Sequence, residues 1–308
     1  SSYWEPDAAM DMDYHVRHSA LPKPGRFREL FNLTSRLHGT LLERSRPLWE
    51  MHVIEGLQNR QFAVYTKTHH AAVDGARSIH ISRSMLSTDP DHVLEESPLS
   101  LQSWQRYKNA LRSGKQMPHT DEELRNVADV LKSTFDSSTN LARALSAFSK
   151  TWAGRGGALS LPHQQVPISS LNHSIHGARR FVAQSWPFSR IEAIGKAFGG
   201  TFNDAVLAMC SGALRQYLKT HAELPEQPLK SMVPVSLRKE GDLESGNAIA
   251  AISANLATDV ADPARRIQAI IASVRAGKAF YAGMSPKEIE LVSAVLQAPT
   301  MLLLPLGL

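Results

Sequence analysis

The chain has 308 residues, of which 43% are hydrophobic and only 20% charged, so it is not wholly disordered and has enough apolar material for a sizeable core. This length favours two domains of roughly 150 residues each. The formal net charge of +5 suits an anionic ligand or a membrane surface but is too small to indicate nucleic-acid binding, so we expect no nucleic-acid partner. The one cysteine, Cys210, excludes an internal disulfide and any zinc or iron–sulfur site built from several cysteines.

The two ends of the chain bear on the expected localisation. Residues 1–20 carry acidic side chains and no apolar run, so they do not resemble a secretory signal peptide. Residues 291–308 are uncharged, but Pro299 and Pro305 interrupt them, which argues against a membrane-spanning helix and favours a buried or surface-seeking segment. We therefore expect a reduced, cytoplasmic protein.

The first part of the chain predicts one helix followed by two strands. Apolar side chains recur at steps of three and four over residues 27–42, which is the spacing of an amphipathic helix, and Pro47 follows its end. Apolar residues alternate with others over 51–53 and again over 62–66, with the polar residues 58–60 between them. This pattern fits two adjacent strands joined by a turn.

The second of these strands runs directly into a pair of histidines, His69 and His70. Asp74 and Gly75 then mark a turn, and a further helix is expected over 79–85. The paired histidines, which are the most distinctive feature of the sequence, are therefore predicted at the end of a strand.

Residues 88–171 differ in composition from the segments on either side. Prolines separate polar, weakly amphipathic helical stretches such as 121–135 and 141–152, which indicates a helical crossover and linker. The glycine-rich residues 154–157 are its expected flexible point, and a second globular unit is expected to begin near Arg179.

The second unit is predicted to open with a strand over 181–185 and a helix over 191–198, which the Gly-Gly pair at 199–200 would end. Asn203 is a favourable cap for the strongest helical pattern in the chain. One apolar face of that helix is expected to be buried, and its members are Val206, Cys210, Ala213, Leu214, Tyr217 and Leu218.

Strand patterns at 232–236 and 247–256 and a helical pattern over 265–274 complete the expected elements. No repeat of fixed period is evident. Helices and strands alternate in two units, so we predict an α/β or mixed α+β fold.

The paired histidines are the leading candidates for chemistry. Successive strand residues point to opposite faces, so one of the two faces a given cleft. A neutral imidazole, with an ordinary pKa of about 6.5, removes a proton from a hydroxyl or thiol near neutral pH when its other nitrogen is held in one tautomer. The alternative is structural: the two histidines and Asp74 satisfy one another at a turn.

Other site chemistries find little support in the sequence. A zinc site needs three or four convergent ligands, and neither an HExxH helix nor a third partner accompanies the histidines, so we expect no metal. No G-x-S-x-G elbow, P-loop or dinucleotide-binding fingerprint occurs. Elimination favours a histidine base that works without a metal or a protein nucleophile.

Four motifs stand in a fixed order along the chain. A complete H-H-x-x-x-D-G motif occupies His69–Gly75, and P-L-W stands at Pro47–Trp49. Asn203-Asp204 heads the long predicted helix, and Val233–Arg238 is followed by Gly246-Asn247. In these motifs, their order and their spacing, the chain resembles the bacterial wax ester synthase/acyl-CoA:diacylglycerol acyltransferases, within the wider group of CoA-dependent acyltransferases and peptide condensation domains.

This resemblance covers nearly the whole chain and implies two similar domains with mixed sheets and an active-site tunnel between them. Residues 1–87 would belong to the N-terminal domain that carries the histidine motif, 88–178 to the crossover, and 179–308 to the C-terminal domain. Family members have more sequence before and after the matched part, so we expect both domains to be incomplete here.

The resemblance also assigns roles to the motif that carries the histidines. The family's catalytic base is the second histidine, which is His70 here, while His69 and Asp74 support the loop and Gly75 completes the motif. The tetrahedral oxyanion needs a hydrogen-bond donor, for which Asn203 is the first candidate. That residue also suits a helix cap, so the structural alternative stays open.

The remaining candidates would bind or position substrate. They are Pro47, Leu48 and Trp49 at the acyl channel, Asp204 at the helix N-terminus, Asn247 as the second oxyanion donor, and Arg238 as one cation for the CoA phosphates. Each has a structural alternative, since a tryptophan at a strand start is often core and Gly-Asn is often a turn. Other cations available for the phosphates are Arg179, Arg180, Lys239, Arg265 and Arg266.

The reaction that the resemblance implies is transfer of a long-chain acyl group from acyl-CoA to the hydroxyl of a fatty alcohol or diacylglycerol. It needs no cofactor besides the acyl-CoA co-substrate and no acyl-enzyme, and we expect the protein to associate peripherally with membranes or lipid inclusions. Two alternatives stay open: a condensation-type or small-acyl transferase that shares the histidine motif, and a catalytically inactive lipid-binding module.

Overall fold

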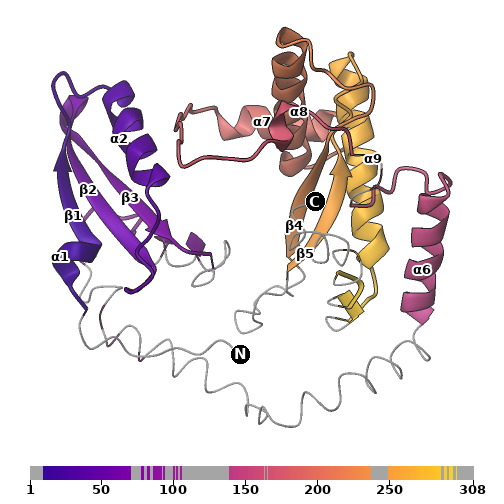
Figure 1. The fold of residues 1–308 in the computed structure, drawn as a ribbon, viewed down its shortest axis with the longest axis horizontal. Helices are drawn as coiled ribbons and strands as arrows, with labels where there is room; N and C mark the ends of the chain where they lie inside the picture. Colours follow the sequence, from indigo (N-terminus) through magenta and orange to yellow (C-terminus); the bar gives the residue numbers. More distant parts are fainter. Residues whose placement is uncertain are drawn as a thin grey trace. The chain divides into compact units, whose positions relative to one another are not determined.

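A computed structural model describes residues 10–70, 139–162, 166–236 and 249–285, with the shorter pieces 78–79, 82–83, 86–91, 93, 100, 102, 105, 164, 288–289, 291–293 and 296. These residues fall into two compact units, unit 1 within 1–113 and 174–185 and unit 2 within 114–173 and 186–308. Both units combine helices with a small sheet (Figure 1), so the predicted mixed α/β fold is confirmed.

Unit 1 is built on a three-stranded mixed sheet of order β1-β2-β3. β1 (Val16–Ala20) runs parallel to β2 (Trp49–Leu57), and β2 pairs antiparallel with β3 (Gln61–Thr68) through the short turn η1 (Gln58–Arg60). The two strands and the polar turn that the alternation predicts are therefore confirmed as one hairpin.

α2 (Phe27–Gly39) packs on one face of this sheet (Figure 1), as its apolar spacing predicts. Leucines of α2 at steps of three and four meet buried residues just after β1 and in β2. The cluster consists of Leu30, Leu33, Leu37, Leu21, Ile54, Leu57, Ala63 and Tyr65. A short helix, α1 (Met12–His15), precedes β1. The sequence predicts neither α1 nor β1.

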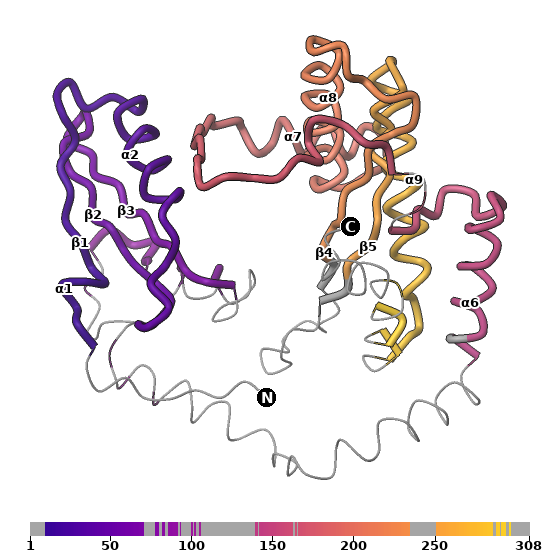
Figure 2. Tube along the Cα trace, viewed as in Figure 1, coloured from indigo at the N-terminus to yellow at the C-terminus, as the bar shows by residue number. Residues whose placement is uncertain are grey.

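Unit 2 contains an antiparallel pair of strands and most of the described helices. The elements are η2 (Ser170–Asn172), α6 (Thr139–Trp152), α7 (Phe188–Ala197), α8 (Phe202–Thr220), β4 (Lys230–Ser236), β5 (Ile249–Asn255) and α9 (Pro263–Tyr281). Figure 2 shows α9 running beside β5, where Ile252 and Ala254 of the strand pack with Ile270 and Val274 of the helix. The helices and strands predicted between 191 and 274 are confirmed, although α9 extends to Tyr281.

The strand predicted over 181–185 is wrong. These residues lie outside every described strand, and the Phe181 N–H donates to Ser35 Oγ of α2 at 2.7 Å. The Ser35 hydroxyl thus accepts the hydrogen bond of the Phe181 N–H, which in a sheet would go to the carbonyl of a neighbouring strand.

Two further helices of the sequence prediction are described only in part or not at all. In the range 79–85, Ile79, Ser82 and Arg83 are helical, and the rest lies outside the described residues. The stretch 121–135 also lies outside them, whereas the stretch predicted at 141–152 is confirmed as α6.

Candidate active site

The β2–β3 hairpin brings two of the sequence motifs to the same end of the sheet. Trp49, the first residue of β2, pairs with Thr68, the last residue of β3. The backbone N–H of His69 donates to the carbonyl oxygen of Leu48 at 2.9 Å. The P-L-W motif and the paired histidines, about 20 residues apart in the sequence, are therefore adjacent in space.

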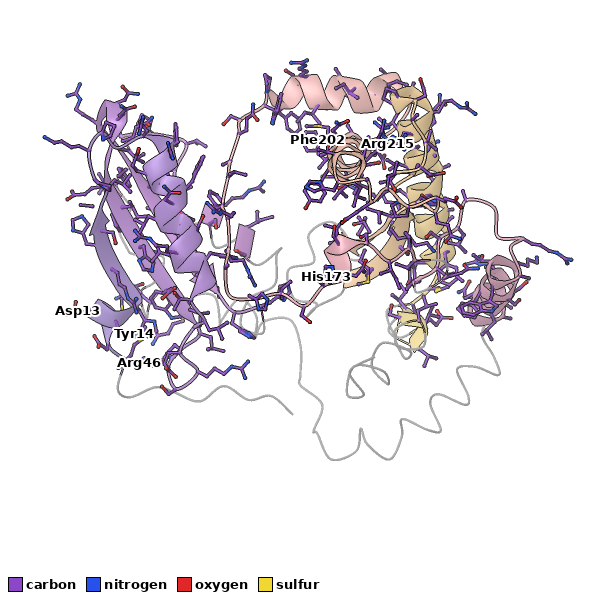
Figure 3. All side chains as sticks on the ribbon, turned by 45° about the horizontal axis from the view of Figure 1, so that its top comes forward. Asp13, Tyr14, Arg46, His173, Phe202 and Arg215 are labelled. Atoms are coloured by element: carbon purple, nitrogen blue, oxygen red, sulfur yellow. The ribbon has the colours of Figure 1, made fainter. Side chains whose placement is uncertain are left out.

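The segment that enters β2 is anchored to α1. The guanidinium carbon of Arg46 lies 4.3 Å from the centre of the Tyr14 ring (Figure 3), and Arg46 Nη1 lies 3.6 Å from Asp11 Oδ2. A cation over an aromatic face and an opposite charge both attract this guanidinium. These contacts hold the chain immediately before Pro47.

Trp49 is fixed through its ring and its backbone. The half-buried indole stacks on the ring of His15 with 4.6 Å between centroids. Nδ1 of the fully buried His15 lies 2.7 Å from the carbonyl oxygen of Trp49, and because a carbonyl only accepts, Nδ1 must carry the proton. Trp49 therefore packs against unit 1 and keeps part of its surface exposed.

The alternation along β3 ends just before the two histidines. The even-numbered residues from Phe62 to Thr68 are exposed, whereas the odd-numbered residues from Ala63 to Lys67 are half-buried on the α2 side. His69 and His70 follow directly and are both exposed. β3 ends at Thr68, so His69 lies just past the strand and His70 lies in the turn that follows.

A buried polar cluster, which the sequence reasoning missed, lies beside this strand end. Glu50 is 9% exposed, and its carboxylate lies 3.5 Å from Lys67 Nζ, 3.9 Å from Arg17 Nη1 and 3.8 Å from His52 Nε2. Glu50 and His52 alternate with apolar residues and share the buried face of β2 with Ile54. The pattern that signals this cluster is a strand whose buried positions are polar.

His52 is the most constrained member of the cluster. It is 2% exposed, and neither ring nitrogen has a hydrogen-bond partner among the described residues. Burial lowers the pKa of His52, against the opposing effect of the Glu50 carboxylate. The centres of the His52 and Tyr65 rings lie 5.9 Å apart. Burial raises the pKa of the Tyr65 hydroxyl.

The start of α8 differs from the prediction. Thr201 is the cap: its hydroxyl oxygen accepts from Asp204 N at 3.3 Å, while Asp204 Oδ2 accepts from Thr201 N at 2.7 Å. Asn203 is the second residue inside the helix and is exposed, so the expectation that it caps α8 is wrong. Asp204 is buried, and its Oδ1 has no hydrogen-bond partner within the described part of the chain.

The buried face of α8 also differs from the prediction. Cys210, Ala213 and Tyr217 are exposed, so their assignment to the core is wrong, whereas Leu218 is buried as expected. A polar residue, Ser211, takes a core position because its hydroxyl donates to the carbonyl oxygen of Leu256 at 2.5 Å. Hydrogen bonding to the loop after β5 sets the rotation of this helix.

Labelled residues in Figure 3 mark the contacts at the two ends of α8. Near its start, the Phe202 ring stacks on Phe188 of α7 with 4.5 Å between centroids. Towards its end, Arg215 donates to the carbonyl oxygens of Thr258 at 2.5 Å and Asp259 at 3.0 Å.

The remaining site candidates lie outside the described residues: Asp74, Gly75, Arg238 and Asn247. Within the described residues no group of three or more His, Cys, Asp or Glu side chains is arranged to hold a metal ion. In the same part of the chain, no helix is long and apolar enough to cross a bilayer.

A sequence profile of the wax ester synthase/diacylglycerol acyltransferase catalytic domain matches residues 1–206, about two thirds of the chain. The chain belongs to this family. The resemblance inferred from the motifs is therefore confirmed.

Individual members of the wax ester synthase/diacylglycerol acyltransferase family match almost the whole chain. It is 43% identical over 297 residues to "Probable diacyglycerol O-acyltransferase tgs2" of Mycobacterium tuberculosis and 38% identical over 297 residues to "O-acyltransferase WSD" of Acinetobacter baylyi, and covers 63% of each. Both matches take in 96% of this chain.

The fold also matches a solved member of the family. The wax ester synthase/diacylglycerol acyltransferase from Marinobacter aquaeolei superimposes with a TM-score of 0.69 at 35% identity. The match covers 99% of this chain and 62% of that structure. The chain thus spans a little under two thirds of the length of the relatives it matches.

Proposed function

We propose that this protein transfers the acyl group of a long-chain acyl-CoA to the hydroxyl of a fatty alcohol or a diacylglycerol. The observation that carries the proposal is the contact of the P-L-W motif with the paired histidines at one end of the sheet of unit 1. Family membership and the names of the relatives support the same reaction class.

His70 acts as the general base in this proposal. An imidazole nitrogen of His70 takes the hydroxyl proton while the alcohol oxygen attacks the thioester carbonyl carbon. The tetrahedral adduct then collapses, the carbon–sulfur bond breaks, and the proton passes from His70 to the departing sulfur. The products are an ester and CoA thiol, and no acyl-enzyme forms.

Asn203 supplies a donor to the tetrahedral oxyanion in the proposed mechanism. Because Thr201 already fills the cap position, capping no longer accounts for the amide of Asn203. Asp204 supports this role indirectly, since its carboxylate fixes the first turn of α8 through Thr201.

The P-L-W motif forms part of the acyl channel in the proposed site. Pro47, Leu48 and Trp49 are all half-buried, so each keeps apolar surface available beside the histidines. Roles for four further residues rest on the motif resemblance: Asp74 and Gly75 order the histidine loop, Asn247 is the second oxyanion candidate, and Arg238 binds CoA phosphate.

We further propose that the enzyme works in the cytoplasm at the surface of a membrane or lipid inclusion. Both its product and its acceptor are water-insoluble, and the formal net charge of +5 favours an anionic lipid surface. Large exposed apolar side chains, including Phe62, Val64 and Trp152, are consistent with such contact.

The test is release of CoA from palmitoyl-CoA with hexadecanol or dioleoylglycerol as acceptor, with the ester product identified by mass spectrometry. We expect ester formation by the wild type and none above background by His70→Ala. Because Cys210 is an exposed free thiol, the background with the thiol reagent is measured without acyl-CoA. A folded protein that forms no ester with either alcohol would contradict the proposal, and amide formation with an amine acceptor would indicate a condensation-type enzyme.

A further inference from the structure

Unit 1 contains a groove with a volume of about 820 Å³ that the proposed acyl-transfer step at His70 does not use. It is lined by α2, by Ala20–Pro22 at the end of β1 and by the segment Gly177–Arg180. This volume lies within the range of pockets that hold small molecules and cofactors.

Contacts at both ends fix the segment 177–181 against α2. At one end, Phe181 N–H donates to Ser35 Oγ at 2.7 Å, and the rings of Phe31 and Phe181 meet edge to face at 5.5 Å. At the other end, Gly39 approaches Gly177 so closely that a Cβ on Gly39 would lie 2.7 Å from the Gly177 carbonyl oxygen. The groove is therefore shaped by specific contacts between two parts of the chain that are far apart in sequence.

The side chains that line the groove carry an excess of positive charge. Arg36 comes from α2, and Arg179 and Arg180 come from the segment opposite. The acidic lining residue, Glu29, is neutralised by Arg26 at 2.8 Å, whose hydrogen bonds lower the pKa of Glu29 to about 2. Within the described residues no carboxylate pairs with Arg36 or Arg180.

We infer that this groove binds the phosphate groups of the acyl donor, namely the 3′-phosphate and the diphosphate of CoA, an assignment that rests on the proposed function. Guanidinium groups suit phosphate because they donate two parallel hydrogen bonds to it. Arg36 and Arg180 line the same groove, so a multiply charged anion bound there is attracted by both.

The groove ends close to the strand that carries the base. Lys67 Nζ donates to the carbonyl oxygen of Leu37 at 3.0 Å and to that of Thr40, so the end of α2 is tied to β3. His70 follows Lys67 by three residues. Gly39, which lines the groove, therefore lies at the end of α2 that is tied to β3.

The probe is adenosine 3′,5′-bisphosphate, which carries CoA phosphates without the acyl chain, and its binding is measured by titration calorimetry. We expect Arg36→Gln and Arg180→Gln each to weaken binding by about tenfold or more, because each removes a charged hydrogen-bond donor. Arg28→Gln is the matched control, since Arg28 is exposed on the same helix and does not line the groove. Thermal melting confirms that all three variants are folded.

The inference is overturned if the bisphosphate does not bind, or if it binds the two groove variants as tightly as the control. Vesicles of phosphatidylglycerol in phosphatidylcholine separate the other source of phosphate: if the groove variants lose only vesicle binding, the ligand is a lipid headgroup and the assignment to CoA is wrong.

Kinetics with palmitoyl-CoA separate this inference from the proposed function. The groove variants are expected to raise KM for palmitoyl-CoA about tenfold with little change in kcat, since the lost contact is remote from the reacting atoms. Arginine-dependent binding of the bisphosphate without acyl transfer would leave the groove assignment standing and contradict the proposed reaction. Acyl transfer with an unchanged KM in both variants would support the proposed reaction and contradict the groove assignment.

Discussion

At the scale of single residues, the proposed mechanism assigns catalysis to His70 and a supporting role to His69. We expect His70→Ala to lower kcat by about 10² to 10⁴, the usual contribution of a well-placed base. His69→Ala should keep measurable activity, because the contact of His69 with Leu48 is made by its backbone and survives the substitution. Rates of CoA release for both variants, with melting temperatures as the folding control, test this assignment. A dead but folded His69→Ala variant would reverse the roles.

His52 predicts a pH dependence of stability. Burial lowers its pKa in the folded state below the ordinary value of about 6.5, so the unfolded chain binds the proton more readily. Above about pH 6.5 His52 is neutral in both states and costs no stability. As the pH falls from there through the lowered pKa of the folded state, the unfolded chain takes up the proton first and the free energy of unfolding decreases. We expect the free energy of unfolding to decrease between pH 7.5 and pH 5.5.

His52→Leu tests the source of that slope, because leucine fills a similar space without a titrating group. Urea unfolding should show a weaker pH dependence for His52→Leu than for the wild type over the same range. His18→Leu is the control, since His18 lies on the same sheet but is exposed beside Glu55 at 3.5 Å. Equal slopes in the wild type and His52→Leu would exclude His52 as the cause.

The position of the histidine pair could be predicted from sequence, whereas the buried cluster beneath it could not. A regular alternation over 62–66 carries the strand directly into His69, so its end is readable. Glu50 and His52 break the rule that buried strand positions are apolar, and their burial depends on Lys67 and Arg17 from two other strands. Such ion pairs depend on which strands lie side by side in the fold, so the local sequence does not reveal them.

At the scale of elements, α8 allows the capping role of Thr201 to be tested apart from the proposed catalytic role of Asn203. Thr201→Ala should destabilise the protein by about 1 kcal/mol, since it removes the side chain that caps the helix. Asn203→Ala should change stability by less than about 0.5 kcal/mol, because the side chain is exposed and makes no cap bond. If Asn203 serves the oxyanion, its alanine variant also loses about 10² to 10³ in kcat.

Chemical denaturation of the two α8 variants, together with their rates, gives a clear division of roles. A large stability loss in Asn203→Ala would restore it as the cap. The Thr-x-x-Asp spacing at 201–204 is a recognisable capping box, so the true cap was available from sequence.

Gly25 fixes the connection between β1 and α2. It has a φ of 70°, and a Cβ there would lie 1.8 Å from the carbonyl oxygen of Gly56 in β2. Gly25→Ala therefore combines a left-handed conformation, which costs about 1–2 kcal/mol, with a backbone clash. Gly154 is the matched control, since its φ is 74° and nothing lies within 4 Å of the added atom.

Urea unfolding should show that Gly25→Ala is destabilised by at least about 2 kcal/mol more than Gly154→Ala, since only the former must displace backbone. Equal losses in the two variants would mean that the approach of Gly25 to Gly56 is relaxed without cost.

The local sequence pattern predicts elements in which the apolar repeat continues over several turns, and it fails for β1 and for residues 181–185, where the pattern is short. α2 and α9 repeat their apolar steps over several turns, so tertiary contacts do not alter their identity. β1 has five residues with no clear alternation, and it exists because its backbone pairs with β2. The wrong strand at 181–185 is the opposite case, in which three alternating residues find a hydroxyl of α2 instead of a strand.

At the scale of the whole molecule, motif order identified the family, but the site residues come from distant parts of the chain. The hairpin of unit 1 unites two motifs that are separate in sequence, and this contact follows from the predicted turn at 58–60. The groove between α2 and 177–180 had no sequence signal, because its two walls are joined by more than 130 residues.

The preference for acyl chain length is the prediction that depends on the whole substrate path. Each methylene moved from water into an apolar channel contributes about 0.8 kcal/mol, and 1.4 kcal/mol is a factor of ten, so two buried methylenes already favour a longer chain by about tenfold. We expect kcat/KM for palmitoyl-CoA to exceed that for acetyl-CoA by at least about 10², with hexadecanol or dioleoylglycerol as acceptor. Trp49→Ala should reduce this ratio, because it removes a half-buried ring beside the histidines that we expect to contact the acyl chain of the substrate. Competition between the two donors in one reaction, with products quantified by mass spectrometry, measures the ratio directly. A preference for acetyl-CoA would place the protein among the small-acyl transferases that share its histidine motif.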